Sequence, residues 1–183
     1  MKYNMIYIST LIVIIPTLIF VSLSNIIPYK DNILNNVRIK KLSRGEFNRE
    51  LTMSKDYDSY PKYENAITLE TWYIVDTYDT SSGEVFKMYE HVKPNGFVNT
   101  KHVHPYQIEE ITVIKGGVNL ILENKKEIFI NKGESFSIPA TIEHEINNRE
   151  CNDETLMKVS YYPAIKNQEN LFIRLSKLSK IPG

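Results

Sequence analysis

The chain lacks two features that would define large classes of protein. Its 183 residues include a single cysteine, Cys151, so no disulfide can form within the chain, and iron–sulfur clusters and multi-cysteine zinc sites are excluded. It also lacks an excess of charge, with 22 basic and 22 acidic residues. Because nucleic-acid phosphates require a basic face, nothing in this balance predicts a nucleic-acid partner.

The N-terminal segment lacks charge altogether. No charged residue occurs over 3–29, and the stretch 5–23 is dominated by Ile, Leu, Val and Phe. That length is sufficient to cross a hydrocarbon layer about 30 Å thick as a helix, so we predict a single-pass membrane anchor over residues 1–27. Five basic residues within 30–44 favour a cytoplasmic barrel by the positive-inside rule. A cleaved secretory signal, with a secreted or extracytoplasmic barrel, is the alternative, since Ser22-Leu-Ser24 is a small-x-small pattern.

The rest of the chain divides into three parts. Residues 28–68 are basic and then rich in Asp, Tyr, Ser and Pro, which predicts a basic tether followed, over 50–68, by a polar linker that can cover a sheet edge. A short amphipathic helix over 30–49, lying on an anionic membrane surface, is the alternative to the tether. Residues 69–165 alternate apolar and polar positions between turn signals, which is typical of β-strands. In the tail, residues 166–183, the pattern changes to that of a helix.

This terminal helix has its own expected features. Asn167 is the expected cap, and the helix is expected to pack on the barrel or to make a dimer contact. The expected apolar stripe is Leu171, Phe172, Leu175 and Leu178.

Two histidine-bearing segments are the most informative feature. In a strand, alternate side chains share a face, so His102 and His104 are expected to point the same way as a chelating pair. The following alternating run puts Glu109, Ile111 and Val113 on one face. If that face is the interior, the Glu109 carboxylate enters it beside the histidines.

His144 arrives from a separate strand and completes a set of three imidazole nitrogens and one carboxylate oxygen. Such a set suits one divalent transition metal, namely Fe, Mn, Ni, Cu or Zn. A metal that prefers six ligands keeps two adjacent positions open for water, a substrate or dioxygen. That openness is the usual difference between a reactive metal site and a structural one.

The spacing of these residues resembles the two motifs of the cupin superfamily. The first motif is matched by Gly96, His102, His104, Glu109 and Gly116, and the second by Gly133, Pro139, His144 and Asn148. The one departure is Thr141, where the family usually has glycine, and threonine tolerates a positive φ poorly.

The resemblance implies an all-β fold, a double-stranded β-helix or jelly-roll barrel. It also implies that His102, His104, Glu109 and His144 bind the metal, and it makes oxygenase chemistry the commonest function. Glu109 is then the one candidate catalytic base, since in related proteins this residue sometimes leaves the metal.

Three functions are compatible with these observations. The first is a metal-dependent, dioxygenase-like enzyme acting on a small oxygen-bearing molecule, and the second is a non-catalytic module that binds or senses a small ligand. The third, a purely structural jelly roll, is disfavoured by the retention of all four ligand types. Exposed barrel edges favour a homodimer.

Three residues outside the ligand set carry weaker expectations. Gln107 is the best candidate for a further group near the metal or substrate. For Tyr161 we expect a packing role, with the lining of a pocket as the alternative, and for His91 a surface position.

Overall fold

The computed structural model describes residues 39–123, 127–148 and 153–180, without the side chains of residues 97–100. The predicted anchor over residues 1–27 lies outside this part of the chain. Within the described ranges no helix combines the length and apolar character needed to span a bilayer.

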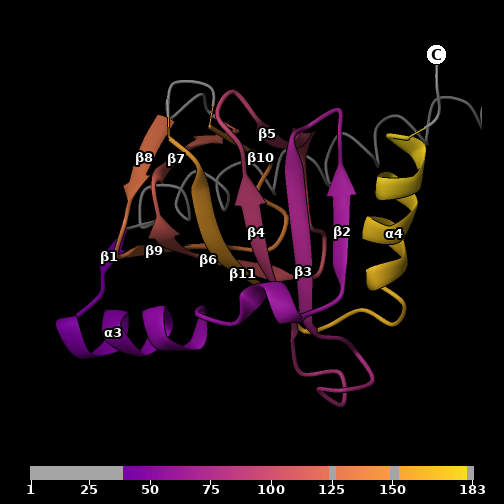
Figure 1. Cartoon of the computed structure of the whole chain (residues 1–183), viewed down its shortest axis with the longest axis horizontal. Coiled ribbons are helices and arrows are strands. Elements are labelled where there is room, and N and C mark those ends of the chain that lie inside the picture. The colour runs from indigo at the N-terminus through magenta and orange to yellow at the C-terminus, as the bar shows by residue number, and fades with distance from the viewer. Residues whose placement is uncertain (1–38, 124–126, 149–152, 181–183) are drawn as a thin grey trace, which may run out of the picture. The chain divides into compact units, whose positions relative to one another are not determined.

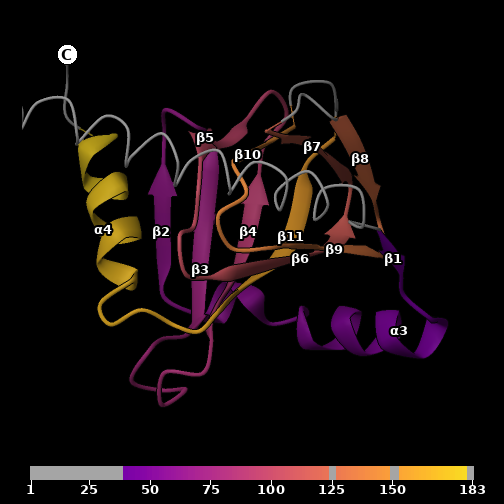
Figure 2. The same cartoon turned by 180° about the vertical axis from the view of Figure 1, so that it is seen from behind.

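Two antiparallel sheets make up the domain (Figures 1 and 2). The larger sheet has the order β1 (Lys40–Lys41), β9 (Glu134–Ile138), β6 (Ile108–Lys115), β11 (Thr155–Tyr162), β4 (Phe86–Val92), β3 (Glu70–Asp76) and β2 (Lys62–Asn65). The smaller sheet has the order β5 (Phe97–His102), β10 (His144–Asn147), β7 (Gly117–Leu122) and β8 (Glu127–Asn131). The expected all-β, sheet-rich fold is confirmed.

The core lies between the sheets and is built from alternate strand positions. Ile111 and Val113 of β6 are fully buried, as the alternation of this strand predicts. The other strands contribute their own inward-facing apolar side chains in the same way: Phe86, Met88, Leu120, Leu122, Phe136, Ile138, Ile146, Met157 and Val159.

The predicted linker is more ordered than its sequence indicates. It contains α3 (Arg44–Met53) and the 3-10 turn η1 (Tyr57–Ser59). A capping box begins α3, because the Ser43 hydroxyl accepts from the Glu46 N–H and the Glu46 carboxylate accepts from the Ser43 N–H. The flanking strands β1 and β2 form the two edges of the larger sheet, so this segment runs from one edge to the other.

Tyrosines of this segment pack on the outer face of the larger sheet. The ring of Tyr57 meets that of Tyr73 edge-on at a centroid distance of 4.8 Å, and Tyr60 lies 6.4 Å from Tyr89. Because Tyr73 and Tyr89 are buried, the linker residues cover a second, smaller apolar cluster outside the barrel. The sequence predicts only the covering of an edge.

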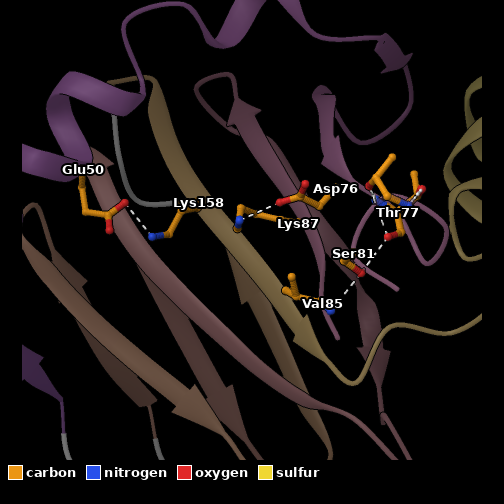
Figure 3. A network of polar contacts seen from close by, with 8 residues as sticks. Glu50, Asp76, Thr77, Ser81, Val85, Lys87 and Lys158 are labelled. Carbon is orange, nitrogen blue, oxygen red and sulfur yellow. Dashed lines mark hydrogen bonds and ion pairs between the residues drawn. The ribbon is translucent and has the colours of Figure 1, made fainter. Parts of the chain in front are cut away.

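Ion pairs fasten the same outer surface (Figure 3). The Lys158 ammonium of β11 lies 2.6 Å from Glu50 of α3, with exposed side-chain fractions of 16% and 12%. Lys87 of β4 lies 2.6 Å from Asp76 of β3. Because the Glu50–Lys158 pair is shielded from water, removing either partner would leave an uncompensated, poorly hydrated charge, which costs more than the loss of a surface pair.

The C-terminal helix is confirmed as α4 (Glu169–Leu178), which lies beside β2 (Figure 1). Its predicted cap is wrong: Asn167 has a φ of +63° and stands outside the helix, and Gln168 takes the N-cap position without a side-chain bond.

The predicted stripe of α4 is also only partly right. Leu171 and Leu178 are 55% and 60% exposed, whereas Phe172 is 4% exposed. The Phe172 ring stacks on Phe86 and meets Trp72 edge-on, at centroid distances of 5.4 and 5.2 Å. The buried face of α4 is therefore Phe172 with the small Ser176, and of the predicted stripe only Leu175 is also partly buried.

Candidate metal centre

The structure brings the four predicted donors together. One ligand atom from each of His102, His104, Glu109 and His144 lies within 4.8 Å of the other three. His102 and His144 are direct partners across the β5–β10 pair, so their side chains share a face of the smaller sheet. Glu109 comes from β6 of the larger sheet. The cluster therefore bridges the two sheets.

The separations suit a shared metal ion. The Nε2 atoms of His102 and His104 are 3.1 Å apart, and Oε2 of Glu109 lies 3.2 Å from His104 Nε2 and 2.9 Å from His144 Nε2. A metal with bonds of about 2.1 Å holds neighbouring donors at right angles about 3.0 Å apart. All three distances match that value.

A backbone hydrogen bond orients His144. Its Nδ1 lies 3.0 Å from the carbonyl oxygen of Ile142, which can only accept, so Nδ1 carries a proton. In the neutral imidazole, Nε2 then presents a lone pair toward the Glu109 carboxylate, and both atoms are electron-rich. A cation between them, a proton or a metal ion, makes this contact favourable. The donor chemistry therefore fits a bound divalent metal.

The pKa values of Glu109 and His144 are also shifted in directions that suit a bound cation. Burial alone would raise the pKa of Glu109, but hydrogen bonds and charge from His104 and His144 outweigh it and hold that pKa below its ordinary value. Burial opposes the charged form of His144, yet the Glu109 carboxylate raises the pKa of this imidazole. The carboxylate is thus held ionised, as a metal ligand must be.

His104 departs from its expected place in a strand. β5 ends at His102, so Val103 and His104 lie in the connecting loop, where Pro105 cannot donate to a sheet ladder. The His104 carbonyl accepts a hydrogen bond of 2.8 Å from the Thr141 N–H. This loop-to-loop bond, rather than sheet pairing, holds His104 at the site.

The alternation of side chains nevertheless persists past the end of β5. Val103 is 48% exposed, whereas the Nε2 atoms of His102 and His104 on either side of it both reach the cluster. The predicted chelating pair is therefore present, although its second member lies beyond the strand.

Thr141, which stands where cupins usually have glycine, has a backbone conformation that is costly for threonine. Its φ is +69°, in the left-handed region that glycine tolerates and a β-branched residue does not. We expect Thr141→Gly to stabilise the protein by about 1 kcal/mol, since relieving about 1–3 kcal/mol of strain exceeds the entropic cost of glycine, about 0.5–1 kcal/mol. The hydrogen bond to His104 uses the backbone and is kept. Urea unfolding of both proteins measures the difference.

The matched control for this prediction is Thr141→Ala. Alanine removes the hydroxyl and the branch but keeps a Cβ, so its gain should be smaller than that of glycine. A glycine variant less stable than the parent would contradict the strain argument.

Gln107 and His91, for which the sequence gives weaker expectations, make contacts with residues other than the four donors. Gln107 donates both of its amide bonds to the segment before α4, at 2.7 Å to the Pro163 carbonyl and 3.0 Å to Gln168 Oε1. Its role is therefore to fasten that segment, which the sequence does not indicate. His91 is half-buried on β4, with Nε2 3.3 Å from Glu154, and takes no part in the cluster.

Tyr161 lies closer to the centre than the packing role predicts. Its ring is 5.0 Å from that of His104, and it is directly opposite Glu109 in the β11–β6 pairing. Burial, followed by the negative charge of Glu109 and Glu90, raises the pKa of the Tyr161 hydroxyl well above its usual range. The inward alternation of Met157, Val159 and Tyr161 is the signal that could have placed this hydroxyl inside.

Sequence reasoning also missed two interior carboxyls. Glu70 of β3 and Glu90 of β4 are each 1% exposed. Glu90 shares the inward alternation of Phe86 and Met88, and this is the signal that could have found it.

Comparison with known proteins finds one matching domain family and several solved structures with a similar fold. The family model of the cupin domain matches residues 88–156, which is less than half of the chain. No curated protein matches. Similar solved structures include KdgF from Halomonas sp., at 15% identity over 59% of this chain and 90% of that chain, with a TM-score of 0.50.

Two further structures show the same likeness. An RmlC-like cupin from Shewanella frigidimarina is 12% identical over 62% of this chain and 90% of its own, with a TM-score of 0.50. The oxalate decarboxylase of Lactobacillus farciminis, solved as a formate complex, is 15% identical over 60% of this chain and 32% of its own, with a TM-score of 0.50. At these identities the likeness shows the fold alone. A cupin domain model thus matches the central part of the barrel, residues 88–156, and the solved structures share its fold.

Proposed function

We propose that the barrel binds one divalent transition metal through His102, His104, Glu109 and His144, and that the chain is a metal-dependent enzyme acting on a small oxygen-bearing molecule. The observation that carries the proposal is the convergence of four donor atoms within 4.8 Å. When bound, the metal would supply a Lewis acid for a substrate oxygen and, if redox-active, a route for electrons to dioxygen.

The residues around the donors have definite roles in this proposal. His144 is held in one tautomer by the Ile142 carbonyl, and Glu109 is buried and ionised. A carboxylate whose pKa is lowered is a weak proton acceptor near neutral pH, so the electrostatics favour Glu109 as a ligand over the role of general base. The apolar interior excludes water from the reacting oxygen.

The reaction class is a narrower part of the proposal. We infer dioxygenase-like chemistry because it is the commonest implication of the resemblance to cupins with three histidines and one glutamate. The oxalate decarboxylase among the similar structures acts on a small oxygen-bearing acid, which is compatible with a substrate of that size here. The alternative is a non-catalytic module that binds or senses a small ligand, and the charge-free N-terminal run favours it, because a small-molecule enzyme gains little from a membrane anchor.

Elemental analysis of the 183-residue chain, purified without chelator, tests the metal proposal. We expect close to one transition metal per chain, and a protein that neither carries nor takes up Fe, Mn, Ni, Cu or Zn would refute it. Oxygen consumption by the Fe(II)-loaded protein, measured against diols and dicarbonyls, then separates enzyme from binding module. Turnover with any of these compounds supports the enzyme, whereas saturable binding without turnover supports the module.

Metal binding should weaken in acid. The imidazoles must be neutral to bind, and because the pKa of His144 is raised, a proton competes with the metal into the range above the ordinary imidazole value of about 6.5. The increase in melting temperature on adding metal should therefore grow as the pH rises through that range. Thermal unfolding of metal-loaded and chelator-treated protein, between about pH 5.5 and 8, measures it.

In the metal-free protein, the contribution of His144 to stability changes with pH in the opposite direction. A raised pKa means that the native state holds the His144 proton more tightly than the unfolded state does. The stabilisation from this group is present below the ordinary pKa and lost as the pH rises through the raised value.

An increase in melting temperature on adding metal that does not change with pH would contradict ligation by imidazole.

A further inference from the structure

Two buried acids lie inside the barrel outside the metal cluster. Glu70 and Glu90 come from the neighbouring strands β3 and β4, and each is 1% exposed. Trp72 is directly opposite Glu90 in the pairing of these strands, and its indole N–H donates a bond of 3.2 Å to Glu90 Oε1. The interior thus holds two carboxyl groups close to Trp72, whose ring also meets Phe172 of α4.

Three oxygen atoms in this cluster lack a well-formed hydrogen bond. They are both carboxyl oxygens of Glu70 and the buried Thr68 hydroxyl oxygen, as far as the described residues show. Burial raises the pKa of Glu70, and the nearby Glu90 carboxyl, Thr68 hydroxyl and Trp72 indole lower it in part. Because buried polar atoms without well-formed hydrogen bonds cost free energy, a further donor at this place would be favourable.

The charge of the cluster is also uncompensated. Burial raises the pKa of both carboxyls, and for Glu90 the Glu70 and Glu109 carboxyls raise it further. The groups that shift the two values are burial, other acids, Thr68 and Trp72, and no basic side chain is among them. The site therefore demands a cation or a bound proton.

We propose that Glu70, Glu90 and Thr68 form a subsite for the ammonium group of a small primary amine, whose oxygen-bearing end reaches the metal. This deepens the proposed function and rests on it for the second half of the statement. A primary ammonium carries one positive charge and three N–H donors, one for each of the three oxygen atoms that lack a well-formed hydrogen bond.

A second metal ion suits the cluster less well. Among the described residues, the one group of three or more His, Cys, Asp or Glu side chains with metal-binding geometry is His102, His104, Glu109 and His144. Two carboxyls and a hydroxyl between apolar side chains supply too few oxygens for a hard divalent cation, which takes about six or more.

The pairing of β11 with its two neighbours gives the distance that such a ligand must span. Met157 is opposite Glu90 and Tyr161 is opposite Glu109, so the two sites lie four residues apart along this strand. That separation is about 13 Å between backbone positions, and two glutamate side chains directed inward shorten it. An amino acid or amino alcohol with several bonds between its nitrogen and its oxygen spans such a gap.

Calorimetric titration of the 183-residue chain, loaded with Ni(II), tests the proposal with 5-aminopentanoate and pentanoate as probes. These differ only in the ammonium group. We expect the amino compound to bind at least about tenfold more tightly, as for a charged hydrogen bond. Glu70→Gln and Glu90→Gln should remove this preference, and Glu84→Gln, which alters an exposed loop carboxyl, should keep it.

Equal affinities for the two probes, or a preference that survives both interior substitutions, would overturn the proposal in favour of a structural acid pair that shares a proton. Circular dichroism shows whether the variants fold. If they do not, the wild-type comparison decides alone, with n-butylammonium against n-butanol: selective binding of the ammonium supports the subsite, and no selectivity overturns it.

The same design separates this proposal from the metal function. Chelator-treated protein that binds n-butylammonium but takes up no metal would retain the subsite and refute the metal centre. Protein that binds one metal per chain but shows no preference for ammonium would refute the subsite alone.

Discussion

Replacing His144 by alanine is expected to reduce bound metal from about one per chain to near zero. His144 is fully buried, its orientation is set by the Ile142 carbonyl, and its Nε2 lies 2.9 Å from Glu109. Removing a partner outside the ligand set already costs roughly 10- to 100-fold in metal affinity, so loss of a direct ligand should cost more than about 100-fold. Elemental analysis after dialysis against a fixed free-metal concentration measures it.

His91→Ala is the matched control. This histidine lies on the outward side of β4 beside Glu154, so its loss should leave the metal content unchanged. Because a buried alanine at 144 also leaves a cavity, His104→Ala serves as a second test at a site that is 20% exposed. It should lose metal while keeping a β-rich circular-dichroism spectrum. Full metal content in both site variants would show that the cluster is not the metal site.

Replacing Phe172 by alanine is expected to destabilise the protein by about 3–5 kcal/mol. The ring is 4% exposed, stacks on Phe86 and meets Trp72 edge-on. Its removal leaves a cavity between α4 and the barrel, and it also deletes two aromatic contacts whose geometry adds to simple burial. Urea unfolding followed by tryptophan fluorescence reports the change directly, because Trp72 is the one tryptophan of the chain.

Leu171→Ala is the control on the same helix. That side chain is 55% exposed, so its loss should change stability by no more than about 0.5 kcal/mol. Equal effects of the two substitutions would mean that α4 is held by its whole apolar surface and not by the single aromatic contact.

The candidate site could be predicted because its pattern is local. Strand alternation places every second residue on one face, and this was sufficient to put Glu109 inside with Ile111 and Val113. His102 and His144 then converge because they are partners across β5 and β10. His104 lies outside the strand, and the Thr141 backbone bond that positions it has no signature in the histidine spacing.

The segment 40–65 could not be predicted in the same way. Its tyrosines and lysines are typical of a polar linker, and α3 has no continuous apolar face to mark it. The buried pair of Glu50 and Lys158 is 108 residues apart in sequence. Such contacts depend on which surface the sheet offers, and this is known only once the sheet has formed.

The sequence by itself determined the two-residue period of the strands, the turns between them and the four metal-ligand types, because each depends on neighbours a few positions away. Only the packing of distant strands shows that Glu70 and Glu90 are buried close together, that Phe172 packs between α4 and the barrel, and that Tyr161 lies beside the candidate metal ligands. These depend on contacts between distant strands. Burial and charge compensation are properties of the packed interior, and a linear pattern does not contain them.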